Sequence, residues 1–450
     1  MTVNVVHCVD TEGPLDEKIK DTFKRLNEIF GIDIKASKEN LKKLQNMKIP
    51  LNGLEKSVAK VVNKKNLNYQ KNWKQIDKML DNITSQSFRL KYKDSFGKGW
   101  VFSWFCLDHV GFEKNPRSRD LGYHKIFDHY RKRKVTDGWN NDEIGFHYHP
   151  LPFSKQANHC ATHWWSNGQQ LFEILSRRII ERQWFPTIHR PGFHVCRPES
   201  NWFLEQFIPF DFSNQATKNN SEDNLQKDLN LGRFGDWRRA PRSWEPYNPS
   251  FDDYQKKGNC RRFIFRCLNV GTRIRLLSQQ DVYDAFKLSK ITKKEVVLAF
   301  TNHDFREMEE DIKLVYDYLK KASLKFKDVK WRNLNAKKSA IKSLNLKAIK
   351  KLDFDLEFIE SKVRTTIRIK SSKKIFGPQP FLALKNKKGF FFHDNFDIHT
   401  PFCEWSYTLD KNTIEKKNIE SFGFAANDNE GQCCVINVNP HTGKFIKTNL

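Results

Sequence analysis

The sequence predicts an α/β protein in which buried strands alternate with helices along its first 325 residues. Short apolar runs alternate with segments whose apolar residues recur at helical spacing. Acidic, histidine and arginine side chains gather where these apolar runs end. Parallel strands bring their carboxyl ends to one edge, where α/β barrels and doubly wound sheets have their active sites. Either architecture fits the pattern.

The first expected strand covers residues 3–9, and residues 15–90 follow it with helical spacing, for example at Leu26, Ile29 and Phe30. Further strands are expected at residues 100–107, 144–147, 185–189, 210–213, 262–267 and 296–301. Helices are expected at residues 168–182, 201–208 and 307–321. Turn-forming residues dominate the segment before residue 144 and residues 214–258, which predicts loops there.

The character of the chain changes after residue 325. Within residues 326–355, positions 331–352 hold seven Lys or Arg and no acid, and a basic linker helix is expected. Residues 356–450 contain short alternating runs separated by Gly, Pro, Asn and Asp, which predicts a small all-β domain. The expected organisation is a main domain over residues 1–325, with a helical insertion at 15–95, followed by the linker and the β-rich domain.

Composition narrows the class of protein and its partners. The net charge of +26 fits a lysine-rich solvated surface, and it also fits contact with an anionic membrane or a phosphorylated carrier. No helix-turn-helix, zinc-finger or RNP signature occurs, which argues against a nucleic-acid partner. The nine cysteines form no CxxC pair, and no basic leader precedes the first apolar run. We therefore expect a cytoplasmic protein.

Two histidines and two acids stand at expected strand ends with a spacing of two. His147 and His149 follow one apolar run, and Asp10 and Glu12 follow the first strand. Residues two apart in a strand face the same side, so each pair points one way. Two imidazoles and a carboxylate form a ligand set for a hydrolytic metal site. The alternative is that the histidines are hydrogen-bonded core residues and the acids cap a loop.

Other strand ends supply further candidates. His303 and Asp304 end the last expected strand of the main domain, and we expect Asp304 to cap the following helix while His303 transfers protons. His159 and His163 have the i, i+4 spacing of a helical metal pair. Candidates for a carbohydrate subsite are Tyr123, His124, His129, Trp164 and Trp165. Their alternative is a buried aromatic cluster.

Five segments in this order resemble a known family. Asp-Thr-Glu-Gly-Pro, Glu-Ile-Gly-Phe-His-Tyr-His-Pro, His-Arg-Pro-Gly, Phe-Asp-Phe-Ser and Asn-His-Asp look like the motifs of polysaccharide deacetylases of the NodB-homology group, carbohydrate esterase family four. The resemblance covers residues 1–325 and implies a distorted (β/α) barrel. It also implies metal-dependent removal of an acetyl group by Asp10, Arg190, Asp211 and His303. The implied ligands of the divalent metal, with zinc favoured, are Glu12, His147 and His149.

The resemblance implies a substrate and leaves one assignment open. The substrate would be an acetylated sugar or glycan precursor in surface-polysaccharide metabolism. The family has two adjacent aspartates before its glycine, whereas here Thr11 separates Asp10 from Glu12. Either acid can therefore bind the metal while the other activates the water. The alternative to an enzyme is a non-catalytic protein that binds a glycan or an assembly partner on the same fold.

Overall fold

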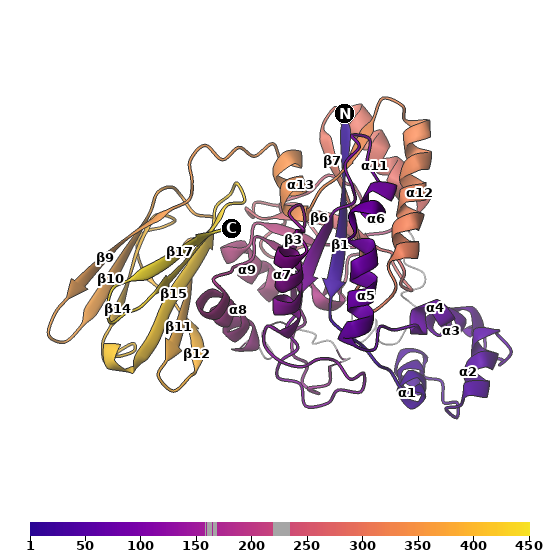
Figure 1. Cartoon of the computed structure of the whole chain (residues 1–450), viewed down its shortest axis with the longest axis horizontal. Coiled ribbons are helices and arrows are strands. Elements are labelled where there is room, and N and C mark those ends of the chain that lie inside the picture. Colours follow the sequence, from indigo (N-terminus) through magenta and orange to yellow (C-terminus); the bar gives the residue numbers. More distant parts are fainter. Residues whose placement is uncertain (158, 160–163, 165–168, 219–234) are drawn as a thin grey trace.

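The structure is a computed structural model that describes residues 1–157, 159, 164, 169–218 and 235–450. It consists of a strand barrel with surrounding helices, a small helical lobe and a β-sandwich (Figure 1). Within these ranges, no helix has the length and apolar character that crossing a bilayer requires.

Seven parallel strands form a closed barrel. They are β1 (Thr2–Thr11), β2 (Phe102–Cys106), β3 (Glu143–Tyr148), β4 (Ile188–Pro191), β5 (Phe210–Asn214), β6 (Phe263–Asn269) and β7 (Glu295–His303). β1 pairs with β7 along one edge and with β2 at its carboxyl half, which closes the ring. β8 (Lys330–Asn333) pairs with the amino half of β1. The predicted alternation of strands and helices is confirmed, and the ring is a barrel rather than an open sheet.

Alternation along the strands decides which side chains lie inside the barrel. On β1, Val6 and Cys8 belong to the inner apolar cluster, whereas Val9 packs outward against the helices. The same period of two carries Asp10 and Glu12 to the inner side at the carboxyl end of the barrel. The site side chains are thus a continuation of the inward-facing row.

Helices cover the outside of the barrel. They are α5 (Trp73–Ile83), α6 (Gln86–Lys91), α7 (Lys125–Thr136), α8 (Gln169–Arg182), α9 (Pro198–Phe207), α11 (Gln279–Thr292) and α12 (Glu309–Lys325). The loop expected before residue 144 is wrong in part, because α7 lies there. Only Ile126, Phe127 and Tyr130 of α7 are buried, so its apolar spacing is too sparse to predict a helix.

The segment between β1 and α5 forms a lobe with its own small core. It contains α1 (Ile19–Phe30), α2 (Lys38–Gln45), α3 (Glu55–Val61) and α4 (Lys64–Leu67). Phe23, Leu26 and Ile29 of α1 pack against Leu44, Val58 and other apolar residues of the lobe. In Figure 1 the lobe projects beside the carboxyl ends of the barrel strands.

Residues 326–355 differ from the expected basic linker helix. Their first part supplies β8, and α13 (Ala336–Ser343) then places Ala336 and Ala340 in the inner apolar cluster of the barrel. α13 lies at the amino end of β1, opposite the helical lobe (Figure 1). The basic composition of this segment does not reveal the buried alanines on one face of α13. These alanines determine where the helix packs.

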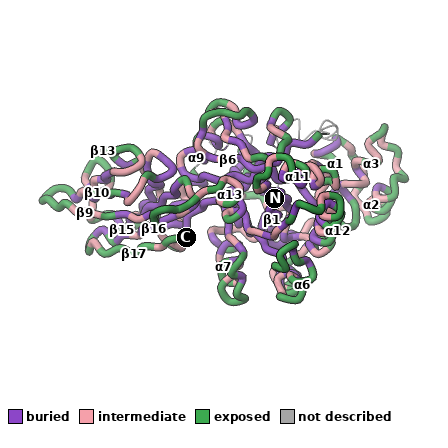
Figure 2. The backbone as a smooth tube through the Cα atoms, turned by 90° about the horizontal axis from the view of Figure 1, so that it is seen from above, coloured by how far each residue is buried: buried purple, intermediate pink, exposed green. Residues whose placement is uncertain are grey.

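Two antiparallel sheets form the C-terminal β-sandwich. One contains β9 (Phe354–Glu360), β10 (Thr365–Ser371), β13 (Asp397–Thr400) and β14 (Glu404–Leu409). The other contains β11 (Phe381–Asn386), β12 (Phe391–Asp394), β15 (Ile419–Asn427), β16 (Cys433–Val438) and β17 (Phe445–Asn449). The second sheet packs on the barrel, where the Asn427 amide donates to the Pro186 and Phe207 carbonyls. Exposed residues gather on the helical lobe and on the outlying β9 and β13 (Figure 2).

Candidate metal centre

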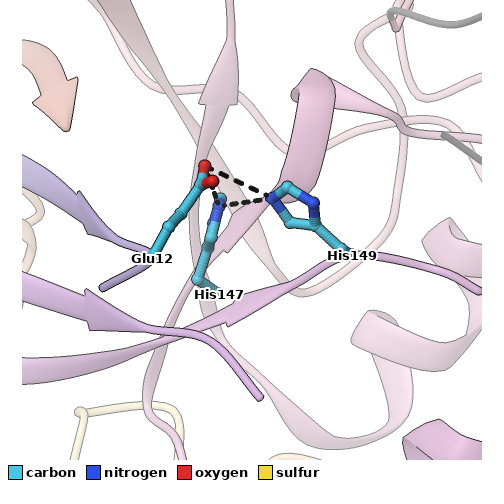
Figure 3. A group of neighbouring side chains, drawn as sticks. All are labelled: Glu12, His147 and His149. Carbon is cyan, nitrogen blue, oxygen red and sulfur yellow. Dashed lines mark hydrogen bonds and ion pairs between the residues drawn. The ribbon is translucent and has the colours of Figure 1, made fainter. Parts of the chain in front are cut away.

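Glu12, His147 and His149 converge at the carboxyl end of the barrel (Figure 3). The Nε2 atoms of His147 and His149 lie 3.1 Å apart. The Oε1 atom of Glu12 lies 3.9 Å from Nε2 of His147 and 3.6 Å from Nε2 of His149. All three residues are buried. Glu12 directly follows β1, His147 lies in β3, and His149 directly follows β3.

These separations fit a divalent metal ion. Zinc bonds of about 2.0 to 2.2 Å in tetrahedral geometry place neighbouring ligand atoms about 3.4 Å apart. His147 Nδ1 lies 2.9 Å from the carbonyl oxygen of Arg190, which can only accept, so Nδ1 carries the proton and Nε2 keeps its lone pair. The group could therefore hold a metal ion with the correct tautomer already set at one histidine.

Neighbouring groups hold Glu12 in place and ionised. Arg119 Nη2 lies 2.7 Å from Glu12 Oε2. Burial opposes the charge of Glu12, but Arg119 and His149 outweigh burial and hold its pKa well below the ordinary value. The Asp304 carboxylate accepts from the backbone N–H groups of Glu12 and Gly13. The expectation that Asp304 caps a helix is wrong, because α12 begins only at Glu309.

Asp10 lies beside this group in a buried ion pair. Arg190 donates to it through Nε at 2.6 Å and through Nη2 at 3.0 Å, and through Nη1 to the carbonyl of Phe212. Burial disfavours the Asp10 carboxylate, yet Arg190 and His147 hold its pKa far below the usual range. The sequence left open which of the two acids binds the metal. In the structure Glu12 lies with the two histidines, whereas Asp10 pairs with Arg190.

His303 completes the wall next to Asp10. The two residues are register partners on adjacent strands, β1 and β7. His303 Nε2 lies 3.7 Å from Glu12 Oε1, and its ring packs at a tilt against Phe305 at a centroid distance of 4.8 Å. Burial lowers the pKa of His303 to about 4, so the imidazole is neutral at neutral pH. A neutral imidazole can accept a proton and later donate it.

Asp211 does not join this group. Phe210 and Phe212 belong to the inner cluster of the barrel, so Asp211 between them faces outward. There Asp211 Oδ2 lies 2.7 Å from Arg262 Nη1, and Asp211 Oδ1 lies 3.2 Å from His189 Nδ1. Its assignment as catalytic is therefore corrected: Asp211 neutralises a fully buried arginine on the opposite face of the sheet.

The Asp211→Asn variant is expected to lose about 3 kcal/mol of unfolding free energy and to keep its metal affinity. Removing the carboxylate leaves Arg262 buried and unpaired, and breaking a buried pair costs about 3 to 5 kcal/mol. Urea denaturation and metal titration measure the two quantities. Asp236→Asn, at a half-exposed pair with Arg238, is the matched control and should change stability by less than about 1 kcal/mol. Unchanged stability with lost metal would restore Asp211 to the site.

The expected carbohydrate subsite is not assembled at the metal centre. His124 lies 2.8 Å from Glu181, and His129 lies 2.9 Å from Asp77. Burial lowers the pKa of both histidines, so these contacts are hydrogen bonds of neutral imidazoles that connect neighbouring helices. Trp164 is buried against Tyr148 and His189. His163 and Trp165 lie outside the described residues.

A cavity of about 140 Å³ opens over the metal centre. Besides the predicted residues, its lining includes Tyr69, Arg117, Arg119, His194 and Arg306. These residues lie in loops or in segments next to turns, where no periodicity marks a site. The signals that could have found them are the Arg-Ser-Arg run at positions 117–119 and Arg306 three residues after His303.

Comparisons of this chain with protein-family models, with curated proteins and with solved structures find no match. The functional argument therefore rests on the geometry of the site.

Proposed function

We propose that this protein is a metal-dependent hydrolase that removes an acetyl group from a small sugar or sugar precursor, as the motif resemblance to polysaccharide deacetylases implies. The observation that carries the proposal is the buried group of Glu12, His147 and His149 beneath an open cavity. Three protein ligands of this type with an open position are typical of catalytic rather than structural metal sites.

The residues around the group supply the remaining chemistry. A divalent ion held by the three ligands would supply Lewis-acid assistance to hydrolysis. His303, neutral at neutral pH, accepts a proton from the attacking water and passes it to the departing nitrogen or oxygen. Asp10, held ionised by Arg190, stabilises the imidazolium that this transfer creates. This division of roles follows from the low pKa of Asp10, which makes it the weaker base.

The dimensions of the cavity favour a small substrate. Sites for drug-sized ligands enclose roughly 300 to 1,000 Å³, whereas this cavity measures about 140 Å³. Apolar residues of the helical lobe, Ile29 and Val61, form part of its wall and limit its length. A monosaccharide unit fits this description better than an internal unit of a long polymer.

Metal content of the purified protein tests the proposal first. Elemental analysis after zinc reconstitution should give about one equivalent in the wild type and none in the His147→Ala, His149→Ala double variant, because two of three ligands are gone. His399→Ala, on the exposed strand β13, is the control and should keep the metal. Hydrolysis of 4-nitrophenyl acetate should follow metal content and stop with a chelator. Absence of metal from the reconstituted wild type would exclude the hydrolase and favour a binding protein.

A further inference from the structure

Arginine side chains dominate the wall of the cavity. Among the described residues, the lining contains Arg25, Arg117, Arg119, Arg273 and Arg306 and two acids, Asp10 and Glu12. Arg25 comes from the helical lobe, and the other four come from segments around the barrel mouth. The lining therefore carries an excess of positive charge even when both acids are ionised, before any metal ion adds more.

The arginines differ in how they are neutralised. Glu17, buried under the lobe, bonds both Arg25 and Arg117 at 2.8 to 2.9 Å. Arg119 shares Glu12 with the two metal-site histidines. Arg306 donates through Nε to the Asn66 carbonyl, and within the described chain no carboxylate pairs with it. The positive charges of Arg119 and Arg306 are therefore only partly balanced by carboxylates of the described residues.

Arg119 and Arg306 both pack against the ring of Phe305, and Arg119 has buried donors without a partner. Their Cζ atoms lie 4.9 and 4.8 Å from the centroid of the same Phe305 ring. Arg119 is 7% exposed, and its Nε and Nη1 atoms are buried without a hydrogen-bond partner. Burial and the neighbouring positive charges lower the pKa of both arginines. Unsatisfied buried donors among like charges are costly, and a bound anion would relieve both penalties.

We propose that this cavity binds an oxyanion, the phosphate or carboxylate of the acylated substrate, at the arginine-lined wall that includes Arg119 and Arg306. The guanidinium fork matches either oxyanion with paired hydrogen bonds. Because Arg119 also touches Glu12, the anion would lie next to the metal centre and fix the acyl group relative to His303. The inference deepens the proposed function, since it names the substrate as an anionic acylated sugar, but the binding itself can be measured without catalysis.

The site differs from the basic run that the sequence singled out. Residues 331–352 lie around β8 and α13 at the amino end of the barrel, on the side opposite the cavity. Their lysines are a surface feature, whereas Arg119 is enclosed. A cavity wall with a buried Arg119 and a half-buried Arg306 fits a discrete small anion rather than a membrane surface or a polymer.

Ligand binding to the full-length protein tests the inference. N-acetylglucosamine 1-phosphate, N-acetylneuraminic acid, N-acetylglucosamine and inorganic phosphate are titrated by calorimetry into the zinc-loaded wild type and variants. The wild type should bind an anionic sugar at least 10-fold more tightly than the neutral sugar. Arg306→Gln should weaken the anionic sugar about 10-fold to 100-fold and leave the neutral sugar unchanged, as for charge-assisted hydrogen bonds of about 1.5 to 3 kcal/mol.

Two further variants control this comparison. Arg368→Gln makes the same charge change on the sandwich strand β10 and should bind as the wild type does. Arg306→Lys keeps the charge but loses the fork, so its affinity should fall between those of the wild type and Arg306→Gln. If the glutamine variant fails to fold, the lysine variant carries the test. Preference for the phosphate or the carboxylate sugar identifies the source of the anion.

The possible failures can be told apart. Equal affinity of the wild type for neutral and anionic sugars, or equal binding by the Arg306 variants and Arg368→Gln, would overturn the anion site. Anion binding that depends on Arg306, in a protein that hydrolyses no acetylated compound, would support the anion site and overturn the proposed function. Hydrolysis of neutral acetylated sugars alone, with no effect of the Arg306 variants, would support the proposed function and overturn the anion site.

Discussion

The His303→Ala variant is expected to lower kcat about 1000-fold while the protein keeps its metal. His303 is the neutral imidazole beside Glu12, and general acid–base catalysis contributes about 100-fold to 10,000-fold. Its side chain supplies none of the three clustered ligand atoms. Steady-state hydrolysis of 4-nitrophenyl acetate and elemental analysis on the same preparation separate loss of rate from loss of metal.

Asp10→Asn is the comparison that decides which group receives the proton. Both Asp10 oxygens are bonded by Arg190, so an amide there should lower kcat less than loss of His303 does. The motif resemblance implies the opposite order, with Asp10 as the base. A larger fall in Asp10→Asn than in His303→Ala would return that role to Asp10 and leave His303 as the donor alone.

Arg190→Met is expected to lower the unfolding free energy by about 3 to 5 kcal/mol, which is the cost of leaving a buried charge unpaired. Arg190 is fully buried, and its guanidinium joins Asp10 on β1 to the Phe212 carbonyl on β5 across the barrel. Loss of this link removes three hydrogen bonds and strands the Asp10 carboxylate. Urea denaturation followed by far-UV circular dichroism measures the change.

Arg332→Met provides the matched control for Arg190. Arg332 is a partly exposed arginine on β8 whose pair with Glu295 lies near the surface, so its loss should cost less than about 1 kcal/mol. Equal effects of the two variants would show that the Asp10–Arg190 pair is no more important than a surface pair. A second variant, Asp10→Asn in the Arg190→Met background, should recover part of the lost stability because no unpaired carboxylate remains.

The candidate metal ligands were predictable, apart from the choice between the two acids, because they lie at or just beyond strand ends. A strand has a period of two, so Asp10 and Glu12, and likewise His147 and His149, face one way in any register. The closed barrel and its strand order then bring the inward-facing side chains at the ends of β1 and β3 together. The same rule applied to Phe210 and Phe212 would have placed Asp211 on the outer face, where the structure has it.

The arginines of the cavity were not predictable in this way. Arg119 and Arg306 follow no period, and their relation arises because the segment before α7 and the segment after β7 meet at Phe305. Asp304 likewise has the composition of a helix cap, but the nearest unsatisfied donors in the folded chain are the N–H groups of Glu12 and Gly13. Contacts between loops depend on distances across the fold, which local sequence does not encode.

The sequence by itself therefore determined the α/β class, most barrel strands, and the histidine pair and the acid pair that could supply metal ligands, because local periodicity governs all of these. Only the tertiary structure decided that Glu12 rather than Asp10 lies with the histidines, that Asp211 faces away, and that the basic run packs beneath the barrel. Those outcomes depend on which buried charges meet across strands, since each buried carboxylate must find a partner. The tertiary structure also brought together the arginines that line the cavity. Their positive charge is the basis of the proposed anion site.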